Sequence, residues 1–267
     1  SANYATAITT VTLTVNEAPA CTTVNLITTG DTRMRASSAS TNYGSETTVR
    51  VSPYSDYPQG GLFKWDLSSI PAGVTVESAS ISFYVTESSA RQFSLYDLRR
   101  AWNESTATYN SYDGTNNWTT AGAANTSNDR YNINLWSDGF NTTGDVTKEL
   151  NTDGLAVIQA WINGSKNNYG FTVQNYSGSD QDYWDVASKE NTSGYTKPTL
   201  NLTYCVQPTV PTILVSSSMT AFSAPVNEYS AVQSYTVTGA NLTAGILVTA
   251  PANFEVSLTS GGDFASS

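Results

Sequence analysis

The sequence of 267 residues contains no histidine. Histidine is the usual general base of serine and cysteine triads and a common zinc ligand, so its absence excludes triad enzymes and most zinc sites. Charged residues make up only 13% of the chain, about half the usual share. No apolar run approaches the roughly 18 residues that a membrane-spanning helix needs, so we expect no membrane insertion.

Basic residues are missing from both ends of the chain. All 12 Lys and Arg residues lie between Cys21 and Cys205, and the formal net charge is −10. The stretch "VQPTVPTIL" after the second cysteine has the proline spacing of a linker. The charge distribution therefore predicts three segments: 1–20, 21–205 and 206–267. So acidic a chain gives no reason to expect a nucleic-acid partner.

The only two cysteines bracket the central segment. A disulfide between Cys21 and Cys205 would join the entry and exit strands of one domain and would indicate an oxidising, extracellular compartment. The alternative is two unrelated buried thiols. We prefer the disulfide because it closes the domain at its two ends.

What the central segment does contain is a series of short runs in which apolar and polar residues alternate. Turn residues separate these runs at short spacing, which is typical of an antiparallel β-sandwich. The expected strands cover 22–27, 32–37, 47–53, 61–67, 78–86, 92–98, 105–110, 171–176 and 198–204. One short helix is expected in "DGLAVIQAWINGS", where Leu155, Ile158, Trp161 and Ile162 repeat at helical spacing before Gly164. The predicted class is all-β, jelly-roll-like, with one helix.

The two flanking segments also alternate like strands. A resemblance to the Ig-like repeats of very large bacterial surface proteins is found in "SYTVTGANLTAGILVTAPANFEVSLT". It implies an Ig-like domain over 206–267, incomplete in this sequence. It also implies that residues 1–20 are the last strand of a preceding repeat. An incomplete sandwich can accept an added strand. Residues 7–16 could therefore complete the last domain of another copy in a head-to-tail filament; the alternative is that the natural protein continues in both directions.

Candidate catalytic residues are scarce. A glycosidase needs two facing carboxylates, and Asp180, Asp182 and Asp185 are the nearest to such a set. They lie in "GSDQDYWD", which is typical of a turn leading into a strand. We therefore expect a chain that is not an enzyme.

Three arginines are gathered in "DTRMRASSASTNYGSETTVRV". If Met34 points inward, alternation turns Arg33 and Arg35 outward, and the same rule turns Arg50 outward between two valines. Lys64 alternates in the same way. Such a cationic face suits an anionic glycan, because guanidinium groups bind carboxylate or sulfate in a bidentate manner. The alternative is that the arginines pair with acidic residues: Glu46, Asp56 or Asp31.

Aromatic residues form a second group of candidates. Trp65, Trp102 and Trp161 are expected in the core. Tyr43, Tyr54, Tyr57 and Trp118 are expected in loops or in a polar excursion, where exposed rings could stack on sugars. Of these, Tyr43 and Tyr54 are the preferred ligand contacts.

A structural Ca²⁺ is the one cofactor that the residues suggest, through oxygen ligands in loops. Asp180 and Asp182 in "GSDQDYWD" and Asp113 in "YDGTNN" are the candidates. Neither stretch matches the EF-hand pattern, and ordinary turns are the preferred alternative.

Several motifs occur in order along the central segment: "DTRMRASSASTNYGSETTVRV", "LFKWDLSSIPAGVTVESASISFYV", "AWNESTATYN", "GDVTKELN…VIQAWINGSKNNYGFTV" and "VASKENTSGYTKPTLNLTY". Together, over residues 24–204, they resemble the DNRLRE domain, also classed as carbohydrate-binding module family 96. The resemblance implies a secreted β-sandwich that accompanies polysaccharide-degrading enzymes and surface proteins. At least one member of the family binds alginate, and the family supplies no catalytic residues.

The sequence therefore predicts a non-catalytic, extracellular module for glycan binding or adhesion, secreted or on a bacterial surface, within a larger multidomain protein. An acidic polysaccharide, rich in uronate or sulfated, is the expected partner. The alternative is a purely structural stalk or filament domain without a ligand.

Overall fold

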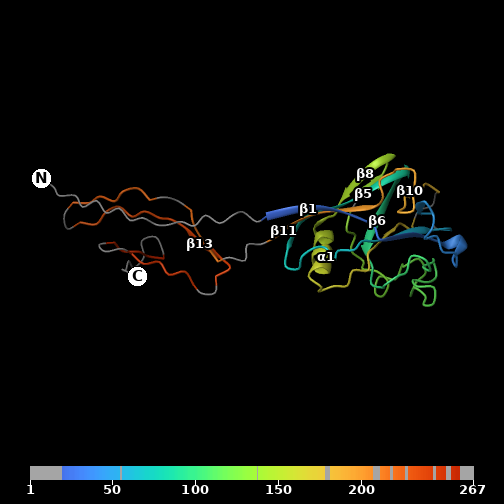
Figure 1. The fold of residues 1–267 in the computed structure, drawn as a ribbon, viewed down its shortest axis with the longest axis horizontal. Helices are drawn as coiled ribbons and strands as arrows, with labels where there is room; N and C mark the ends of the chain where they lie inside the picture. Colours follow the sequence, from blue (N-terminus) through green and yellow to red (C-terminus); the bar gives the residue numbers. More distant parts are fainter. Residues whose placement is uncertain are drawn as a thin grey trace. The chain divides into compact units, whose positions relative to one another are not determined.

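The computed structural model describes residues 20–54, 56–136, 138–177, 181–206, 211–216, 219–225, 228–242, 245–250 and 254–258. The chain divides into two compact units, of which one covers Cys21–Gln207. The described residues of this central unit form mostly β-structure, with one α-helix (Figure 1).

The first sheet of the central unit has six strands. Its order is β1-β11-β5-β10-β3, with β8 also paired to β5. The bounds are β1 Ala20–Ile27, β3 Thr48–Val51, β5 Thr75–Glu87, β8 Gly144–Glu149, β10 Trp184–Ala187 and β11 Thr199–Val206. The long strand β5 alternates as the sequence predicts: Ala79, Ile81, Phe83 and Val85 are buried at every second position.

The second sheet has five strands in the order β2-β4-β9-β6-β7. The bounds are β2 Gly30–Arg35, β4 Gln59–Lys64, β6 Ser89–Asp97, β7 Asp138–Phe140 and β9 Phe171–Gln174. The strand pairs in both sheets are antiparallel, as the sequence predicts. Strand β2 is an edge of this sheet and β3 is an edge of the first.

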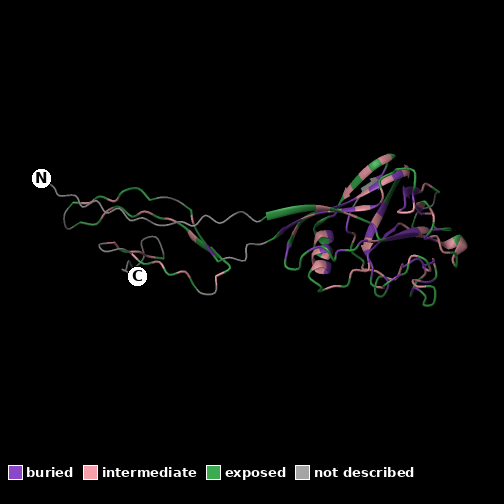
Figure 2. Cartoon of the chain, in the orientation of Figure 1, coloured by how far each residue is buried: buried purple, intermediate pink, exposed green. Residues whose placement is uncertain are grey.

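The main core is rich in aromatic rings contributed by both sheets. Figure 2 colours the buried stretches of these strands purple. Trp184 packs against Phe140 with ring centroids 3.8 Å apart and against Phe83 at 5.3 Å. Helix α1 (Thr152–Ile162) adds Ile158 and Trp161 to the same core. Such large buried rings supply most of the hydrophobic stabilisation of a sandwich of this size.

The helix begins and ends where the sequence predicts. Asn151 is the N-cap, and its Oδ1 accepts a hydrogen bond from the backbone N–H of Gly154 at 3.0 Å. Gly164 has a φ of +69° just beyond the helix, a conformation that favours glycine.

A second apolar cluster contains two residues of the second sheet, Met34 and Leu62, together with residues of the chain that follows β6. That chain contributes Trp102 and Trp118, which are 5% and 4% exposed. The expectation of an exposed Trp118 is therefore wrong, because its ring is buried and its Nε1 donates to Thr108 O at 3.1 Å.

The strand expected over 105–110 is also absent among the described residues. Short polar side chains there bind the backbone locally: Asn103 Oδ1 accepts from the N–H of Ser105, and Thr108 Oγ1 accepts from the N–H of Ser111. Such contacts stabilise turns in competition with a ladder of strand hydrogen bonds.

The expected disulfide between Cys21 and Cys205 is present. It links β1 and β11, which are neighbours in the first sheet. After this bond, strands β12 (Thr212–Val215) and β13 (Val237–Ala240) pair with each other in antiparallel fashion. The strand expected over 7–16 lies outside the described residues, and the proposed Ig-like character of the flanks stays a prediction.

Candidate functional site

A groove with a volume of about 380 Å³ lies among residues of the edge strands β2 and β3, the chain around the start of β4, and the approach to β10. It is lined by Arg35, Ser37, Arg50, Ser52, Tyr54, Tyr57, Gln59, Gln181 and Tyr183. The lining thus combines two guanidinium groups, three phenol rings and two side-chain amides. No carboxylate is among these lining residues.

Arg50 is held rigidly in the groove. It lies directly opposite Asp185 in the β3–β10 ladder, and its Nε and Nη2 donate to the two carboxylate oxygens at 2.8 and 2.6 Å. The hydrogen bond to Asp185 raises the pKa of Arg50. The guanidinium also lies 3.6 Å from the ring centroid of Tyr183. Asp185, weighed above as a catalytic carboxylate, therefore holds an arginine.

Arg35 differs from Arg50 in its partners. Its Nε donates to Ser37 Oγ at 2.8 Å. Among the described residues, no carboxylate forms an ion pair with it. The positive charge of Arg35 is therefore available to an anion that enters the groove, with Ser37 restricting the rotamer of its side chain.

Two tyrosines add aromatic surface. Tyr57 is 55% exposed, and its ring centroid lies 5.9 Å from that of Tyr54 at an interplanar angle of 47°. The backbone N–H of Tyr57 donates to Tyr54 O at 3.1 Å, so a turn sets the spacing of the two rings. A hydrogen bond to Asp56 raises the pKa of Tyr54. Exposed rings of this kind can stack on the apolar face of a sugar.

The other predicted ligand residues do not line this groove. Arg33 pairs with Glu46 at 2.8 Å and lies 4.4 Å from the ring centroid of Tyr43, and its side chain is only 14% exposed. Lys64 Nζ donates to Trp102 O at 3.3 Å and lies 4.7 Å from its ring centroid. The expected single cationic face is thus divided, and the anticipated alternative, pairing with Glu46, describes Arg33.

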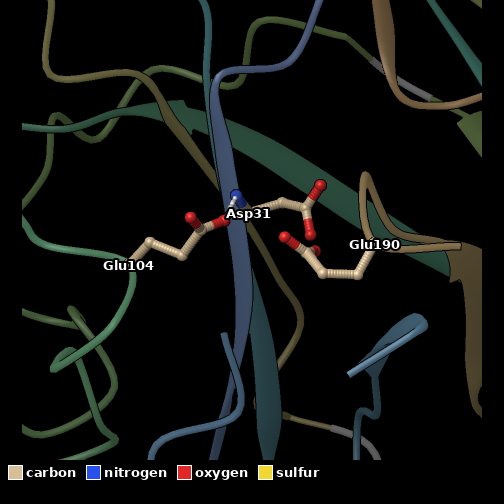
Figure 3. Close-up of side chains that lie close together, drawn as sticks. All are labelled: Asp31, Glu104 and Glu190. Carbon is tan, nitrogen blue, oxygen red and sulfur yellow. Dashed lines mark hydrogen bonds between the residues drawn. The ribbon is translucent and has the colours of Figure 1, made fainter. Parts of the chain in front are cut away.

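A separate cluster contains three acidic residues, Asp31, Glu104 and Glu190. One carboxylate oxygen from each residue lies within 4.8 Å of one carboxylate oxygen from each of the other two. Figure 3 shows Glu104 and Glu190 approaching Asp31 from opposite sides. Burial raises the pKa of Asp31 to about 7; the charges of Glu190 and Glu104 act in the same direction, and a hydrogen bond from the backbone of Lys189 opposes them. No sequence motif joins these three residues, because they are distant in the chain.

Two of the carboxylates that the sequence suggested for Ca²⁺, those of Asp113 and Asp182, lie elsewhere. Asp113 Oδ1 accepts hydrogen bonds from the backbone N–H of Thr115 and Asn116, as in an ordinary turn, and these bonds lower its pKa. Asp182 Oδ2 accepts from the N–H of Ala90 at 3.0 Å. Asp180 lies outside the described residues.

Sequence reasoning missed several lining residues: Ser37, Ser52, Gln59, Gln181 and Tyr183. Tyr183 could have been placed from the sequence, because it directly precedes "WDVA", a run with the pattern of a strand. The two glutamines carried none, because their contribution depends on how the edges of the two sheets meet.

Comparison with known proteins bears on the whole central unit. A family model described as carbohydrate-binding module family 96 matches residues 22–204. A search of curated proteins finds no match. The matched span agrees closely with the resemblance over 24–204, and a family of non-catalytic binding modules fits the expectation that the chain is not an enzyme.

Proposed function

The chain belongs to carbohydrate-binding module family 96, and we propose that the groove formed by Arg35, Arg50 and the tyrosines binds an acidic polysaccharide. The observation that carries this proposal is that one groove contains both Arg35, which forms no ion pair with a carboxylate among the described residues, and the exposed ring of Tyr57. Uronate-rich or sulfated chains carry both of the groups that this lining would contact, an anion and an apolar sugar face.

The two arginines have different tasks in this proposal. Arg35 supplies the charge, because its guanidinium can turn a bidentate face to a carboxylate or sulfate. Arg50 is already bound to Asp185 and stacked on Tyr183, so it mainly fixes the wall of the groove. The binding energy from charge should therefore depend on Arg35 more than on Arg50.

The tyrosines and amides supply the neutral part of the interaction. Tyr57 presents an open ring, while Gln59 and Gln181 offer donors and acceptors for sugar hydroxyls. The tyrosine pair should therefore contribute to binding at high salt, where the charge contribution is screened.

The setting of the groove supports an extracellular role. The disulfide that closes the domain is typical of oxidising compartments. Among the described residues, no helix has the length and apolarity needed to cross a bilayer. We propose that the chain acts in adhesion to polysaccharide outside the cell, as one module of a multidomain bacterial surface protein with Ig-like flanks.

A polysaccharide panel tests the proposal. The chain would be run in native gels containing polygalacturonate, alginate, chondroitin sulfate or neutral xylan, at low salt and at 0.5 M NaCl. We expect retardation by the acidic polymers, reduced but not abolished at high salt. The absence of retardation by every polymer would favour the structural-spacer alternative, and retardation by xylan alone would contradict the role of Arg35.

A further inference from the structure

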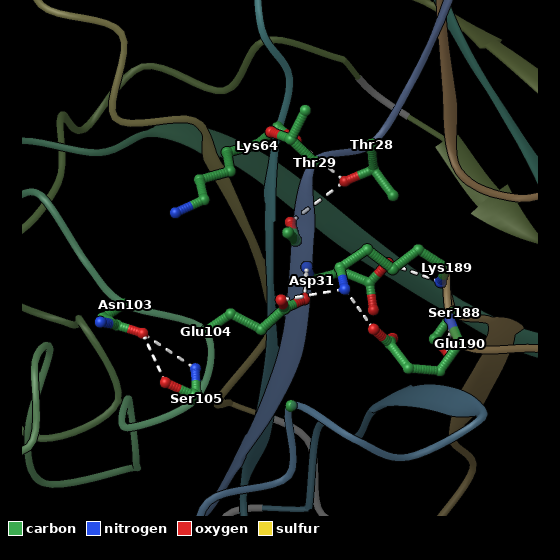
Figure 4. A network of polar contacts seen from close by, with 12 residues as sticks. Thr28, Thr29, Asp31, Lys64, Asn103, Glu104, Ser105, Ser188, Lys189 and Glu190 are labelled. Atoms are coloured by element: carbon green, nitrogen blue, oxygen red, sulfur yellow. Dashed lines mark hydrogen bonds and ion pairs between the residues drawn. The ribbon is translucent and has the colours of Figure 1, made fainter.

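The acidic cluster of Asp31, Glu104 and Glu190 brings together three separate parts of the fold. Asp31 lies in β2, Glu104 lies in the chain that follows β6, and Glu190 lies in the turn after β10. Figure 4 shows the surrounding network of polar contacts. Lys189 is its cation: its Nζ contacts Glu104 Oε2 at 3.0 Å and is in direct contact with Glu190 Oε1.

The charges in this cluster do not balance. Three carboxylates face one ammonium group, which leaves a formal charge of −2 when all are ionised. Lys64 in the same view does not correct this, because its Nζ donates to the carbonyl of Trp102. Uncompensated charge at a site where Asp31 is only 1% exposed carries a large desolvation cost.

Two oxygens in the cluster also have no hydrogen-bond partner among the described residues. Glu104 Oε1 accepts from the N–H of Asp31 at 2.7 Å, and Asp31 Oδ2 accepts from the N–H of Lys189 at 2.8 Å. Asp31 Oδ1 and Glu190 Oε2, in contrast, are buried with no hydrogen-bond partner in the part of the chain that the structure describes. Buried carboxylate oxygens nearly always have a hydrogen-bond partner or a cation beside them, so a cation bound in this cluster would satisfy both acceptors.

We propose that Asp31, Glu104 and Glu190 bind a divalent cation, with Ca²⁺ as the fitting ion. Ca²⁺ is bound by oxygen at 2.3–2.6 Å, so oxygens on opposite sides of it lie about 4.6–5.2 Å apart. Carboxylate oxygens within 4.8 Å of one another can share such an ion with small movements. Mg²⁺ demands a near-ideal octahedral geometry and sheds its water reluctantly, which makes it the poorer fit to a site built by three carboxylates.

Lys189 need not leave when the ion binds. Its ammonium contacts Glu104 Oε2 and Glu190 Oε1, whereas the orphaned oxygens belong to Asp31 and to the other side of Glu190. The lysine nevertheless repels any cation placed beside it. Removal of its charge should therefore strengthen cation binding, while removal of a ligand carboxylate should weaken it.

These opposite signs give a sharp experiment. The chelator-treated chain would be titrated with CaCl₂ by calorimetry, and its thermal unfolding would be followed with and without the ion. We expect one saturable site and a higher unfolding temperature with Ca²⁺ than with Mg²⁺. Glu190→Gln should weaken Ca²⁺ binding at least tenfold, and Lys189→Met should strengthen it several-fold.

Glu149→Gln is the matched control, since Glu149 is exposed on β8 and should leave the affinity within twofold of wild type. Far-UV circular dichroism would establish that each variant is folded. No saturable binding to the wild-type chain overturns the proposal without recourse to any variant. Saturable binding that Glu190→Gln and Lys189→Met change in the same direction, or leave unchanged, overturns the assignment to this cluster.

Discussion

Removal of the Cys21–Cys205 bond should be the most damaging small change to the central unit. The two cysteines are separated by 184 residues in sequence. In the chain-entropy model, a closed loop of that size stabilises the fold by about 5 kcal/mol. For a domain of this length, each kcal/mol shifts the unfolding temperature by about 2–4 °C, so the double serine variant should unfold about 10–20 °C below the wild type.

The assay is differential scanning calorimetry of wild type, both single serine variants and the double variant, with and without reductant. The single variants should match the double variant, and reductant should lower the unfolding temperature of the wild type alone. Thiol labelling of the folded wild type should modify neither cysteine. A loss below about 3 °C in the double variant would refute the reasoning, because loop closure would then contribute almost nothing.

Three further predictions follow from particular contacts. Burial raises the pKa of Asp97 to about 6, against the opposing effects of Lys166 and Arg99. Because the raised pKa favours the protonated form in the folded state, Asp97 contributes to the free energy of unfolding in full below about pH 3.8. That contribution is lost as the pH rises through 6. Urea unfolding from pH 4 to pH 7 should therefore show the wild type losing up to about 3 kcal/mol relative to Asp97→Asn, and parallel pH profiles would contradict it. Gly170→Ala should lower the unfolding temperature more than Gly164→Ala does. Both glycines have a positive φ, but of the two only Gly170 has backbone in the way of a Cβ, which would lie 2.2 Å from Phe63 O. Equal unfolding temperatures of the two variants would contradict the steric argument. Phe83→Ala should cost about 3–5 kcal/mol in urea unfolding, whereas a cost below about 1 kcal/mol would mean that the aromatic core is not closely packed.

The strands of the two sheets were predictable wherever one face is buried and the other is polar. Strand β5 and helix α1 have strong periodic patterns, and the disulfide followed from the position of the cysteines. Strands β7 and β8 were not predicted, because they are short or carry little apolar alternation, and β10 was expected only as a strand that follows the turn in "GSDQDYWD". Trp118 was misplaced for a related reason: the chain around it packs its aromatic rings into a second core without regular secondary structure.

The candidate groove was predictable only in part. Alternation correctly marked Arg35 and Arg50 as polar positions on strands, and Tyr54 as a loop residue nearby. Alternation could not distinguish Arg35 from Arg33, because both lie at alternate positions of β2. Their availability to a ligand differs because Glu46 and Tyr43 lie beside Arg33. The acidic cluster was invisible to pattern analysis, since its members come from three distant segments.

The measurement that tests the central claim most directly is calorimetry of an acidic oligosaccharide, identified by the gel panel, with matched variants. Arg35→Gln and Tyr57→Ala should each weaken binding at least fivefold, and only Tyr57→Ala should still weaken it comparably at 0.5 M NaCl. Arg99→Gln is the control: Arg99 also lies over a tyrosine ring, 3.7 Å from the centroid of Tyr131, but does not line the groove. Affinities of Arg35→Gln and Tyr57→Ala equal to those of wild type and of the control would contradict the assignment of the groove.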